Sequence, residues 1–171
     1  MNKVVKFGGS SLASAEQFKK VGEIIRADRE RKFVVPSAPG KRSSDDTKVT
    51  DMLYACYDLA EQGADFTKEM QAIRDRYQEI IDGLGLKLSL DKEFKTIEKN
   101  FKEKAGSDYA ASRGEYLNGI IMAKYLGFSF VDAAEVIRFK ADGEHDAERT
   151  NTLMRDRPVS YTHLTLPPNR E

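Results

Sequence analysis

Lysine, glycine and serine follow one another directly after the first apolar segment, in residues 6–11 (KFGGSS). Glycine lets a turn approach a ligand closely and adopt positive φ, and turn amides with serine hydroxyls can bind phosphate oxygens. A lysine ammonium group adds the full charge that stabilises a phosphoryl group in transfer. We therefore predict that Lys6, Gly8, Gly9 and Ser10 bind phosphate. The alternative is a tight turn with an incidental lysine.

A second polar loop, residues 36–41, follows the next apolar segment and carries Ser37. The carboxyl ends of the strands of an open α/β sheet line its ligand crevice, so Ser37 is a candidate binding hydroxyl. The Gly-Lys pair at 40–41 does not make a Walker P-loop, because that motif needs a glycine where this chain has Val35. The alternative is that Ser37 only forms a turn.

Two further candidates, Thr50 and Glu115, lie on predicted helices. Thr50 begins its helix and could direct its hydroxyl at an anionic ligand, although a residue there more often caps the helix. Glu115 has only small or short polar residues three and four positions away, so it faces a close neighbour, either backbone or ligand. If buried, its carboxylate needs a cation, such as a substrate amino group, Arg113 or a lysine; a solvent-facing glutamate is the alternative.

The composition excludes several other functions. The 171 residues carry 28 basic and 28 acidic side chains, so no net positive charge favours nucleic acid or an anionic membrane. No apolar run is long enough to span a membrane. The single Cys56 rules out an internal disulfide and fits the cytoplasm, and His145 and His163 lie in unrelated contexts, so we expect no metal site.

A strand–loop–helix–strand unit is predicted to position the N-terminal candidates. Ser14 and Gln17 form a capping box, and the apolar residues after it recur at helical spacing. Residues 33–35 (FVV) are a predicted short buried strand that Pro36 ends. A β-α-β unit implies a parallel sheet covered by helices, because the crossover helix packs on the face of the sheet.

Apolar periodicity and end signals predict four further helices, at residues 49–62 before Gly63, 66–83, 90–101 with Asp91 as cap, and 108–126 before Gly127. The second and third of these have no strand between them, so residues 65–105 form a helical excursion from the sheet. Residues 128–131 are predicted to be the next buried strand. Residues 132–138 fit either a short helix or a turn.

Five segments in order resemble aspartate kinase, a member of the amino-acid kinase superfamily: residues 4–11 (VVKFGGSS), 34–40 (VVPSAPG), 49–53 (VTDML), 112–115 (SRGE) and 130–137 (FVDAAEVI). The first and fourth are specific as a pair, and the resemblance covers about residues 2–157. It implies an α/β fold, a three-layer αβα sandwich with a mainly parallel sheet.

The resemblance also implies a reaction: the γ-phosphoryl group of ATP passes to the side-chain carboxylate of L-aspartate, giving 4-phospho-L-aspartate on the route to lysine, threonine and methionine. Carried over by position, Lys6 stabilises the transferring phosphoryl group, and Gly8, Gly9 and Ser10 form its cradle. Such a transition state depends mainly on positioning and charge neutralisation.

Ser37, Thr50 and Glu115 would hold aspartate, with Glu115 recognising its amino group. ATP would be a co-substrate accompanied by Mg²⁺, without a tightly bound cofactor. The resemblance further implies a cytoplasmic homo-oligomer.

The sequence departs from the family in two respects. Pro36 stands where many relatives have an aliphatic residue, which could shift Ser37. Relatives also continue into a second glycine-rich segment, an arginine that grips aspartate, most of the nucleotide pocket and ACT domains. We therefore expect residues 1–157 to be the N-terminal part of the catalytic domain, with little or no activity alone. Residues 158–171 differ in composition, and we expect a foreign or disordered tail rather than an ordinary irregular one.

Two other readings remain open at this point. One is another amino-acid kinase, such as a glutamate or uridylate kinase, although residues 112–115 and the helical excursion favour aspartate kinase. The other is a non-catalytic helical interaction module that keeps only the opening of the fold.

Overall fold

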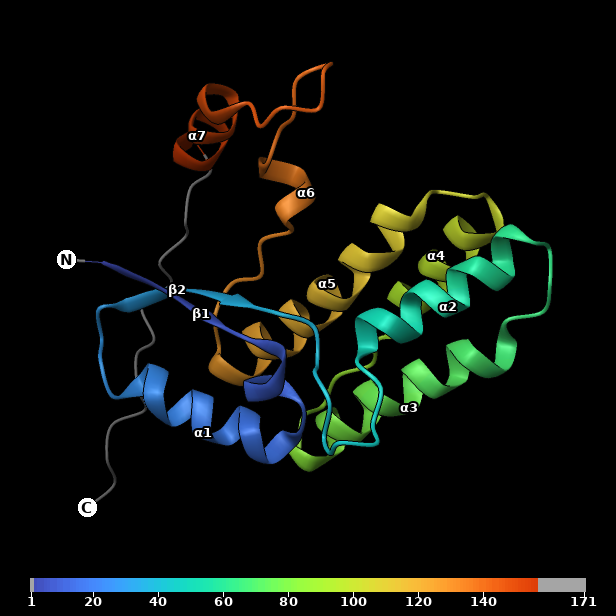
Figure 1. Cartoon of the computed structure of the whole chain (residues 1–171). Helices are drawn as coiled ribbons and strands as arrows, with labels where there is room; N and C mark the ends of the chain where they lie inside the picture. Colours follow the sequence, from blue (N-terminus) through green and yellow to red (C-terminus); the bar gives the residue numbers. More distant parts are fainter. Residues whose placement is uncertain (1, 157–171) are drawn as a thin grey trace. The chain divides into compact units, whose positions relative to one another are not determined.

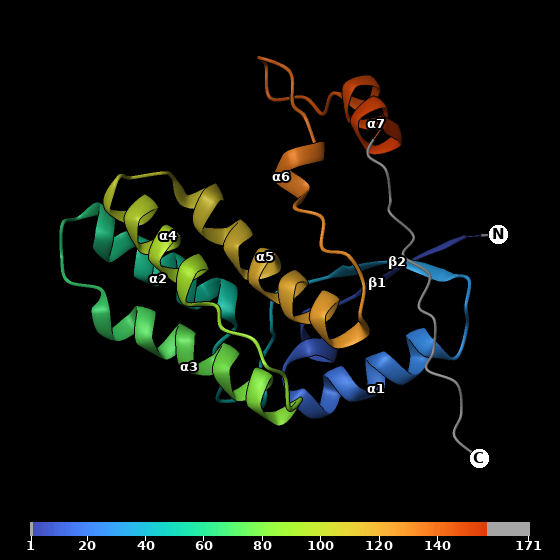
Figure 2. The same cartoon turned by 180° about the vertical axis from the view of Figure 1, so that it is seen from behind.

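The computed structural model describes residues 2–156 and divides into two compact units, Met1–Phe130 and Val131–Glu171. The predicted tail at 158–171 lies outside the described residues. Each unit is described by itself. Figures 1 and 2 show the first as a short sheet next to a group of long helices.

The first unit opens with a parallel β-α-β arrangement, as predicted. Its elements are β1 (Lys3–Phe7), the short 3-10 helix η1 (Gly9–Leu12), α1 (Ala15–Arg26) and β2 (Arg31–Pro36). β1 and β2 pair in parallel, with Lys6 opposite Val35 and Phe7 opposite Pro36. Both strands therefore end at the same edge, where the two predicted ligand loops begin.

The N-cap role predicted for Ser14 at the start of α1 is confirmed. The Ser14 hydroxyl accepts a hydrogen bond from the Gln17 amide at 3.3 Å, which satisfies a donor that the first helical turn leaves free. α1 then buries Phe18, Val21 and Ile25 on one face. The glycine loop does not enter α1 directly, because its second half forms η1 and α1 begins only at Ala15.

The two faces of the sheet differ in burial. Alternate residues Val5, Phe7 and Val34 pack against the core. The residues between them point the other way: Val4 is 68% exposed and Val35 49% exposed. The prediction of a buried strand at 33–35 is therefore only half right, since helices of the first unit cover a single face of this sheet.

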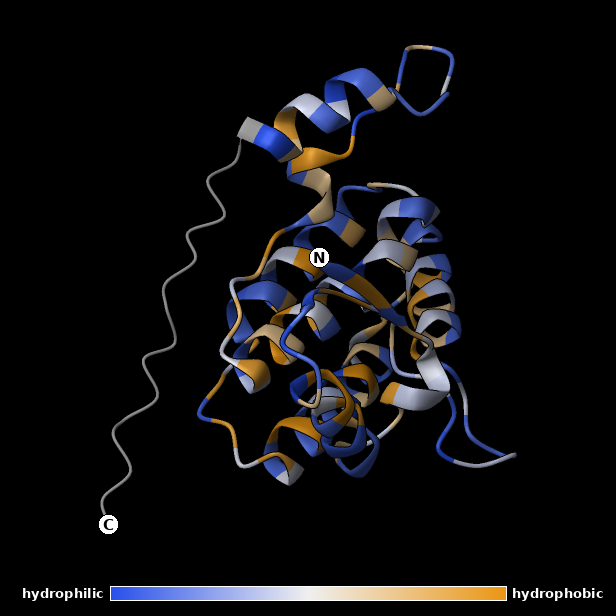
Figure 3. Cartoon of the chain, turned by 90° about the vertical axis from the view of Figure 1, so that its left-hand side faces the viewer, coloured by the Kyte–Doolittle hydropathy of each residue, from blue (hydrophilic) through white to orange (hydrophobic). Residues whose placement is uncertain are grey.

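Four helices form the rest of the first unit: α2 (Val49–Glu61), α3 (Thr67–Gly83), α4 (Asp91–Lys102) and α5 (Ser107–Leu126). α2 packs against α3, α4 and α5, and the described residues place no strand between α3 and α4. Figure 3 shows apolar and polar residues interleaved along these helices, as amphipathic helices require. The apolar stripes form one buried core, so their interpretation as core residues is also confirmed.

The predicted stop signals are correct, whereas one predicted cap is wrong. Both glycines adopt the left-handed conformation: Gly63 (φ 72°) follows the C-cap residue of α2, and Gly127 (φ 72°) is the C-cap of α5. The N-cap of α4 is Leu90, and Asp91 is its first helical residue. The Asp91 amide donates to the Ser89 hydroxyl at 3.2 Å, so a serine two residues earlier replaces the expected cap.

The predicted strand at 128–131 is wrong, because the described residues place no strand there. The segment leaves α5 with the Phe128 amide donating to Ala123 O at 2.9 Å, and Val131 is 47% exposed. Phe130 instead packs on α5, with its ring 5.5 Å from that of Tyr116 in an edge-on arrangement. An apolar run can thus be extended without pairing in a sheet.

The second unit contains α6 (Ala133–Val136) and α7 (Ala147–Asp156). The Asp132 side chain caps α6 by accepting from the Ala134 amide at 3.0 Å, so the ambiguous segment at 132–138 begins as a short helix. The buried Thr150 hydroxyl accepts from the Arg138 amide at 2.9 Å and joins α7 to the segment after α6.

Cys56 lies on α2 in the core of the first unit, with no exposed surface. Burial raises the pKa of its thiol to about 12, and the charges of Glu69 and Glu98 add to this increase. No helix in the described part of the chain is long and apolar enough to cross a membrane.

We predict that Cys56 does not react with a thiol reagent while the protein is folded. With a pKa of about 12, the thiolate population at pH 8 is about a thousandfold below that of an ordinary thiol. The measurement is the labelling rate with iodoacetamide at pH 8, with and without urea. Ser44→Cys in a Cys56→Ala background provides an exposed reference thiol. Equal native rates for the two thiols would contradict the burial of Cys56.

Candidate functional site

The two predicted ligand loops meet at the carboxyl edge of the sheet. The Ser37 amide donates to Phe7 O at 3.0 Å, which extends the strand pairing by one residue. The Gly40 amide donates to Gly9 O at 2.8 Å and joins the loops further along. The topology thus brings the Lys6 segment and the Ser37 segment side by side.

The glycines of the first loop act through close approach rather than through positive φ. Gly8 is the N-cap of η1 with φ −75° and ψ 166°, and neither Gly8 nor Gly9 adopts positive φ, so this part of the prediction is wrong. A Cβ on Gly9 would lie 2.8 Å from Ala38 O, closer than packed atoms allow. A Cβ on Gly8 would meet nothing within 4 Å.

Lys6 and Ser10 present their side chains to solvent beside this loop. Lys6 lies near the end of β1 on the exposed face of the sheet, and no ion pair within residues 2–156 engages its amine. The amine and the Ser10 hydroxyl are therefore available to an anionic ligand.

Ser37 is held in place by the long helix α5. The side-chain amide of Asn118 donates to Ser37 O at 2.7 Å. Asn118 is fully buried, and its Oδ1 atom has no hydrogen-bond partner in the described part of the chain. Ser37 itself is half-buried in the loop that follows β2. In the sequence, Asn118 is only one of the short polar neighbours of Glu115. Its position three residues after Glu115 on the same helix could have indicated that it also lies at the site.

Thr50 is not the cap of its helix, so that alternative is wrong. The N-cap of α2 is Lys48, and Thr50 is the second helical residue, half-buried. The Val49 amide donates to Pro39 O at 3.1 Å and brings the start of α2 next to the Ser37 loop. Thr50 therefore lies in the first turn of a helix whose N-terminal end meets the candidate site.

Glu115 lies close to backbone, which is one of the two close neighbours predicted for it. Its Oε1 atom accepts from the Ala38 amide at 3.4 Å. The carboxylate is exposed rather than buried, so it does not need a cationic partner. No cationic partner of Glu115 occurs within the described residues. The small residues around it allow this approach, since a Cβ on Gly114 would lie 2.6 Å from Ala38 Cβ.

Two residues of α3 support the site, although the sequence pattern did not single them out. The fully buried Tyr77 hydroxyl donates to Gly114 O at 2.8 Å. Burial raises the pKa of Tyr77 well above its usual value, and the nearby Glu115 carboxylate raises it further. Arg76 donates to Gly40 O at 2.7 Å. Tyr77 lies in an apolar stripe that indicated only core packing, and Arg76 lies among charged residues that indicated a solvent-exposed face.

The resulting arrangement combines a lysine, turn amides, three hydroxyls (Ser10, Ser37 and Thr50) and a carboxylate near one loop junction. It suits a ligand with an anionic group at the lysine and an ammonium group at the carboxylate. The described residues contain no group of three or more His, Cys, Asp or Glu side chains that could hold a metal ion.

The amino acid kinase family model matches residues 1–162. The chain belongs to the amino acid kinase family. It is 38% identical to aspartokinase 3 of Bacillus subtilis (strain 168) over 140 residues, which covers 78% of this chain and 31% of that relative. This family member thus spans about a third of the length of the curated relative that it matches.

Solved structures agree with this assignment. The aspartate kinase of Clostridium acetobutylicum is 46% identical, with a TM-score of 0.88 over 92% of this chain and 37% of its own. E. coli aspartokinase III in complex with aspartate and ADP shares 20% identity, a TM-score of 0.71 and 91% and 37% coverage, and supports the fold alone. The predicted α/β class with parallel strands and the resemblance to aspartate kinase are thereby confirmed.

We predict that Gly9→Ala destabilises this family member, whereas Gly8→Ala does not. The new Cβ of Gly9→Ala would push apart the loops at Ala38, at a cost of about 1–3 kcal/mol. Gly8→Ala fits its extended φ and meets open space, so stability should be unchanged or rise by up to about 1 kcal/mol. Urea unfolding measures both. Equal effects would show that the loops are not in close contact.

Proposed function

We propose that this chain is part of an aspartate kinase that transfers the γ-phosphoryl group of ATP to the side-chain carboxylate of L-aspartate, giving 4-phospho-L-aspartate. The observation that carries the proposal is the 46% identity and TM-score of 0.88 with the Clostridium acetobutylicum aspartate kinase over 92% of this chain. The pathway would be the synthesis of lysine, threonine and methionine.

In this proposal the first loop acts on the phosphoryl group. Lys6 neutralises charge on the transferring group, because its amine is exposed and unpaired within residues 2–156. Amides at the start of η1, from Gly9 and Ser10, and the Ser10 hydroxyl would contact phosphate oxygens, while Gly8 leaves open space for them. Fixed donors of this kind need no reorganisation as charge shifts in the transition state.

The second part of the site would hold aspartate. Ser37 and Thr50 offer hydroxyls beside the loop junction, and Glu115 offers a carboxylate to the substrate amino group. The Glu115 carboxylate already accepts from the Ala38 amide, which restricts its orientation, and its exposure leaves lone pairs for a ligand. A charged hydrogen bond of this kind is stronger than a neutral one.

The remaining parts of the proposal rest on the family. Magnesium would arrive with ATP, and we assign it no ligand, because the described residues hold no cluster suited to a metal ion. Residues 1–157 would belong to the catalytic domain, in a cytoplasmic homo-oligomer. E. coli aspartokinase III, whose complexes with aspartate and ADP and with lysine and aspartate are known, shares the fold.

The experiment that tests the proposal is a chimera. Residues 1–156 of this chain replace the superposing segment of the Clostridium acetobutylicum aspartate kinase, and ATP consumption is measured with aspartate or glutamate. We expect aspartate-dependent turnover in the chimera and little or none in the chain alone, which spans about a third of its relatives. An inactive, folded chimera would contradict the proposed function, and preference for glutamate would contradict the substrate.

Lys6→Met in the active chimera should lower kcat by about 10²–10³-fold, because one fixed group that stabilises transition-state charge is lost. KM for aspartate should change much less. Lys19→Met, which removes an exposed lysine of α1, is the matched control and should leave kcat unchanged. A kcat for Lys6→Met within a factor of three of the parent would rule out the role given to Lys6.

Glu115→Gln in the same chimera should raise KM for aspartate by about 10–100-fold, in line with the loss of a charged hydrogen bond. The variant keeps an oxygen that can accept from the Ala38 amide, so the loop stays in place. Glu61→Gln on α2 is the control. If KM for aspartate were unchanged, Glu115 would not recognise the amino group.

A further inference from the structure

Arg76 is a buried arginine in the middle of α3, with only 5% of its surface exposed. A buried guanidinium group is costly unless it is paired and hydrogen-bonded. Its partners belong to the loop between β2 and α2 rather than to a neighbouring helix. Groups of that loop therefore compensate the buried charge of Arg76.

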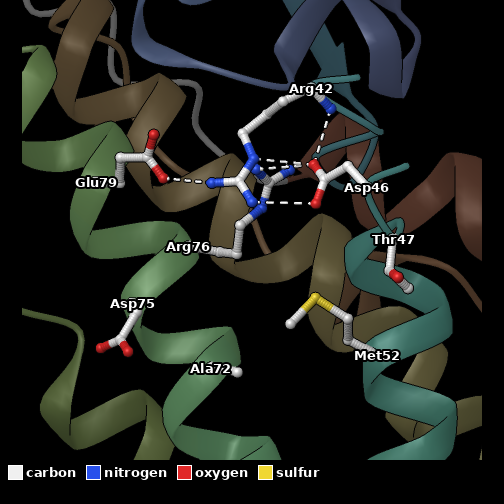
Figure 4. A pocket seen from close by; sticks show the side chains of 8 residues that line it. All are labelled: Arg42, Asp46, Thr47, Met52, Ala72, Asp75, Arg76 and Glu79. Atoms are coloured by element: carbon white, nitrogen blue, oxygen red, sulfur yellow. Dashed lines mark hydrogen bonds and ion pairs between the residues drawn. The ribbon is translucent and has the colours of Figure 1, made fainter. Parts of the chain in front are cut away.

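The guanidinium group of Arg76 joins both ends of the loop segment 40–46. Its Nη2 atom donates to Gly40 O at 2.7 Å, and its Nη1 atom lies 3.2 Å from Asp46 Oδ2. Figure 4 shows Arg76 and Arg42 gathered around the Asp46 carboxylate. Asp46 also accepts from the Arg42 backbone amide at 2.8 Å, so the loop is closed by side chain and backbone together.

The pocket beside this cluster, about 360 Å³ in volume, does not have the character of an anion site. Its lining contains two arginines, Arg42 and Arg76, and three acidic residues, Asp46, Asp75 and Glu79. Arg42 pairs with both Asp46 and Glu79, and its hydrogen bonds hold the pKa of Asp46 well below its usual range. The positive charges are thus already neutralised, which leaves a structural role for Arg76.

Gly40, whose carbonyl accepts from Arg76, also contacts the first loop through its amide. The Gly40 amide donates to Gly9 O at 2.8 Å. A Cβ on Gly40 would lie 2.6 Å from the carbonyl carbon of Gly9, so the two backbones are in direct contact. A shift of Gly40 must therefore either break this hydrogen bond or move Gly9.

We propose that Arg76 is a positioning residue for phosphoryl transfer. Its contacts hold Gly40 next to Gly9 and so fix the loop that carries the proposed phosphate-binding amides. The expected effect on catalysis rests on the proposed function, whereas the contacts of Arg76 do not depend on it. Arginine suits the role because its planar fork serves two acceptors at once, whereas lysine offers a point charge.

The first test uses the full chain. In Arg76→Met, the Gly40 amide should exchange with solvent at least about tenfold faster than in the parent, as seen by NMR hydrogen exchange. Arg76→Lys, which keeps one contact, should fall between the two. The matched control is Arg74→Met on the same helix, because Arg74 pairs with Glu98 and stacks on Phe94, away from the loops. An unchanged Gly40 exchange rate in Arg76→Met, or an equal increase in Arg74→Met, would overturn the proposal.

The second test uses the active chimera. Arg76→Met should lower kcat about tenfold or more, with less than a threefold change in either KM, whereas Arg74→Met should lower only thermal stability. Partial recovery of kcat in Arg76→Lys is expected. A parental kcat in folded Arg76→Met would overturn the positioning role while the proposed function stands. An inactive parental chimera would contradict the proposed function, and the Gly40 exchange rates would then decide on Arg76.

Discussion

The contact between the backbones of Gly9 and Gly40 is the constraint around which the first unit is arranged. It requires glycine on both sides, since a Cβ at either position would lie within 2.8 Å of the other loop or of Ala38. Gly114 on α5 likewise has no side chain, which leaves room for the side chain of Ala38. Three positions without side chains thus let a strand end, a loop and a helix converge.

The helical bundle gives this convergence its rigidity. Its helices donate to three backbone carbonyls around the site: Asn118 to Ser37, Tyr77 to Gly114 and Arg76 to Gly40. All three donors are buried polar side chains, whose unmet hydrogen bonds would each cost about 1–3 kcal/mol. Moving the loop after β2 would leave Asn118 and Arg76 without these acceptors, so the bundle acts as a scaffold for the site as well as a core.

The sequence predicted those features that depend on local periodicity and missed those that depend on distant partners. The helices, the N-cap at Ser14 and the stop at Gly127 follow from side-chain spacing and φ preferences, and the structure has them. The strand predicted at 128–131 failed because an apolar run does not specify a pairing partner. Arg76 was missed because a charged residue in an amphipathic helix normally faces water, and only the folded loop shows what it binds.

The hydrogen bonds that hold the site also carry a consequence for the order of folding. The strands and helix of the β-α-β unit lie close together along the chain, whereas Asn118 reaches Ser37 across 81 residues and Glu115 reaches Ala38 across 77. Closing a loop of this length costs conformational entropy, so contacts with such separations form late in folding. We therefore expect the candidate site to be among the last parts of the first unit to form, after α5 docks. A newly made chain would have most of its helices before it has this site.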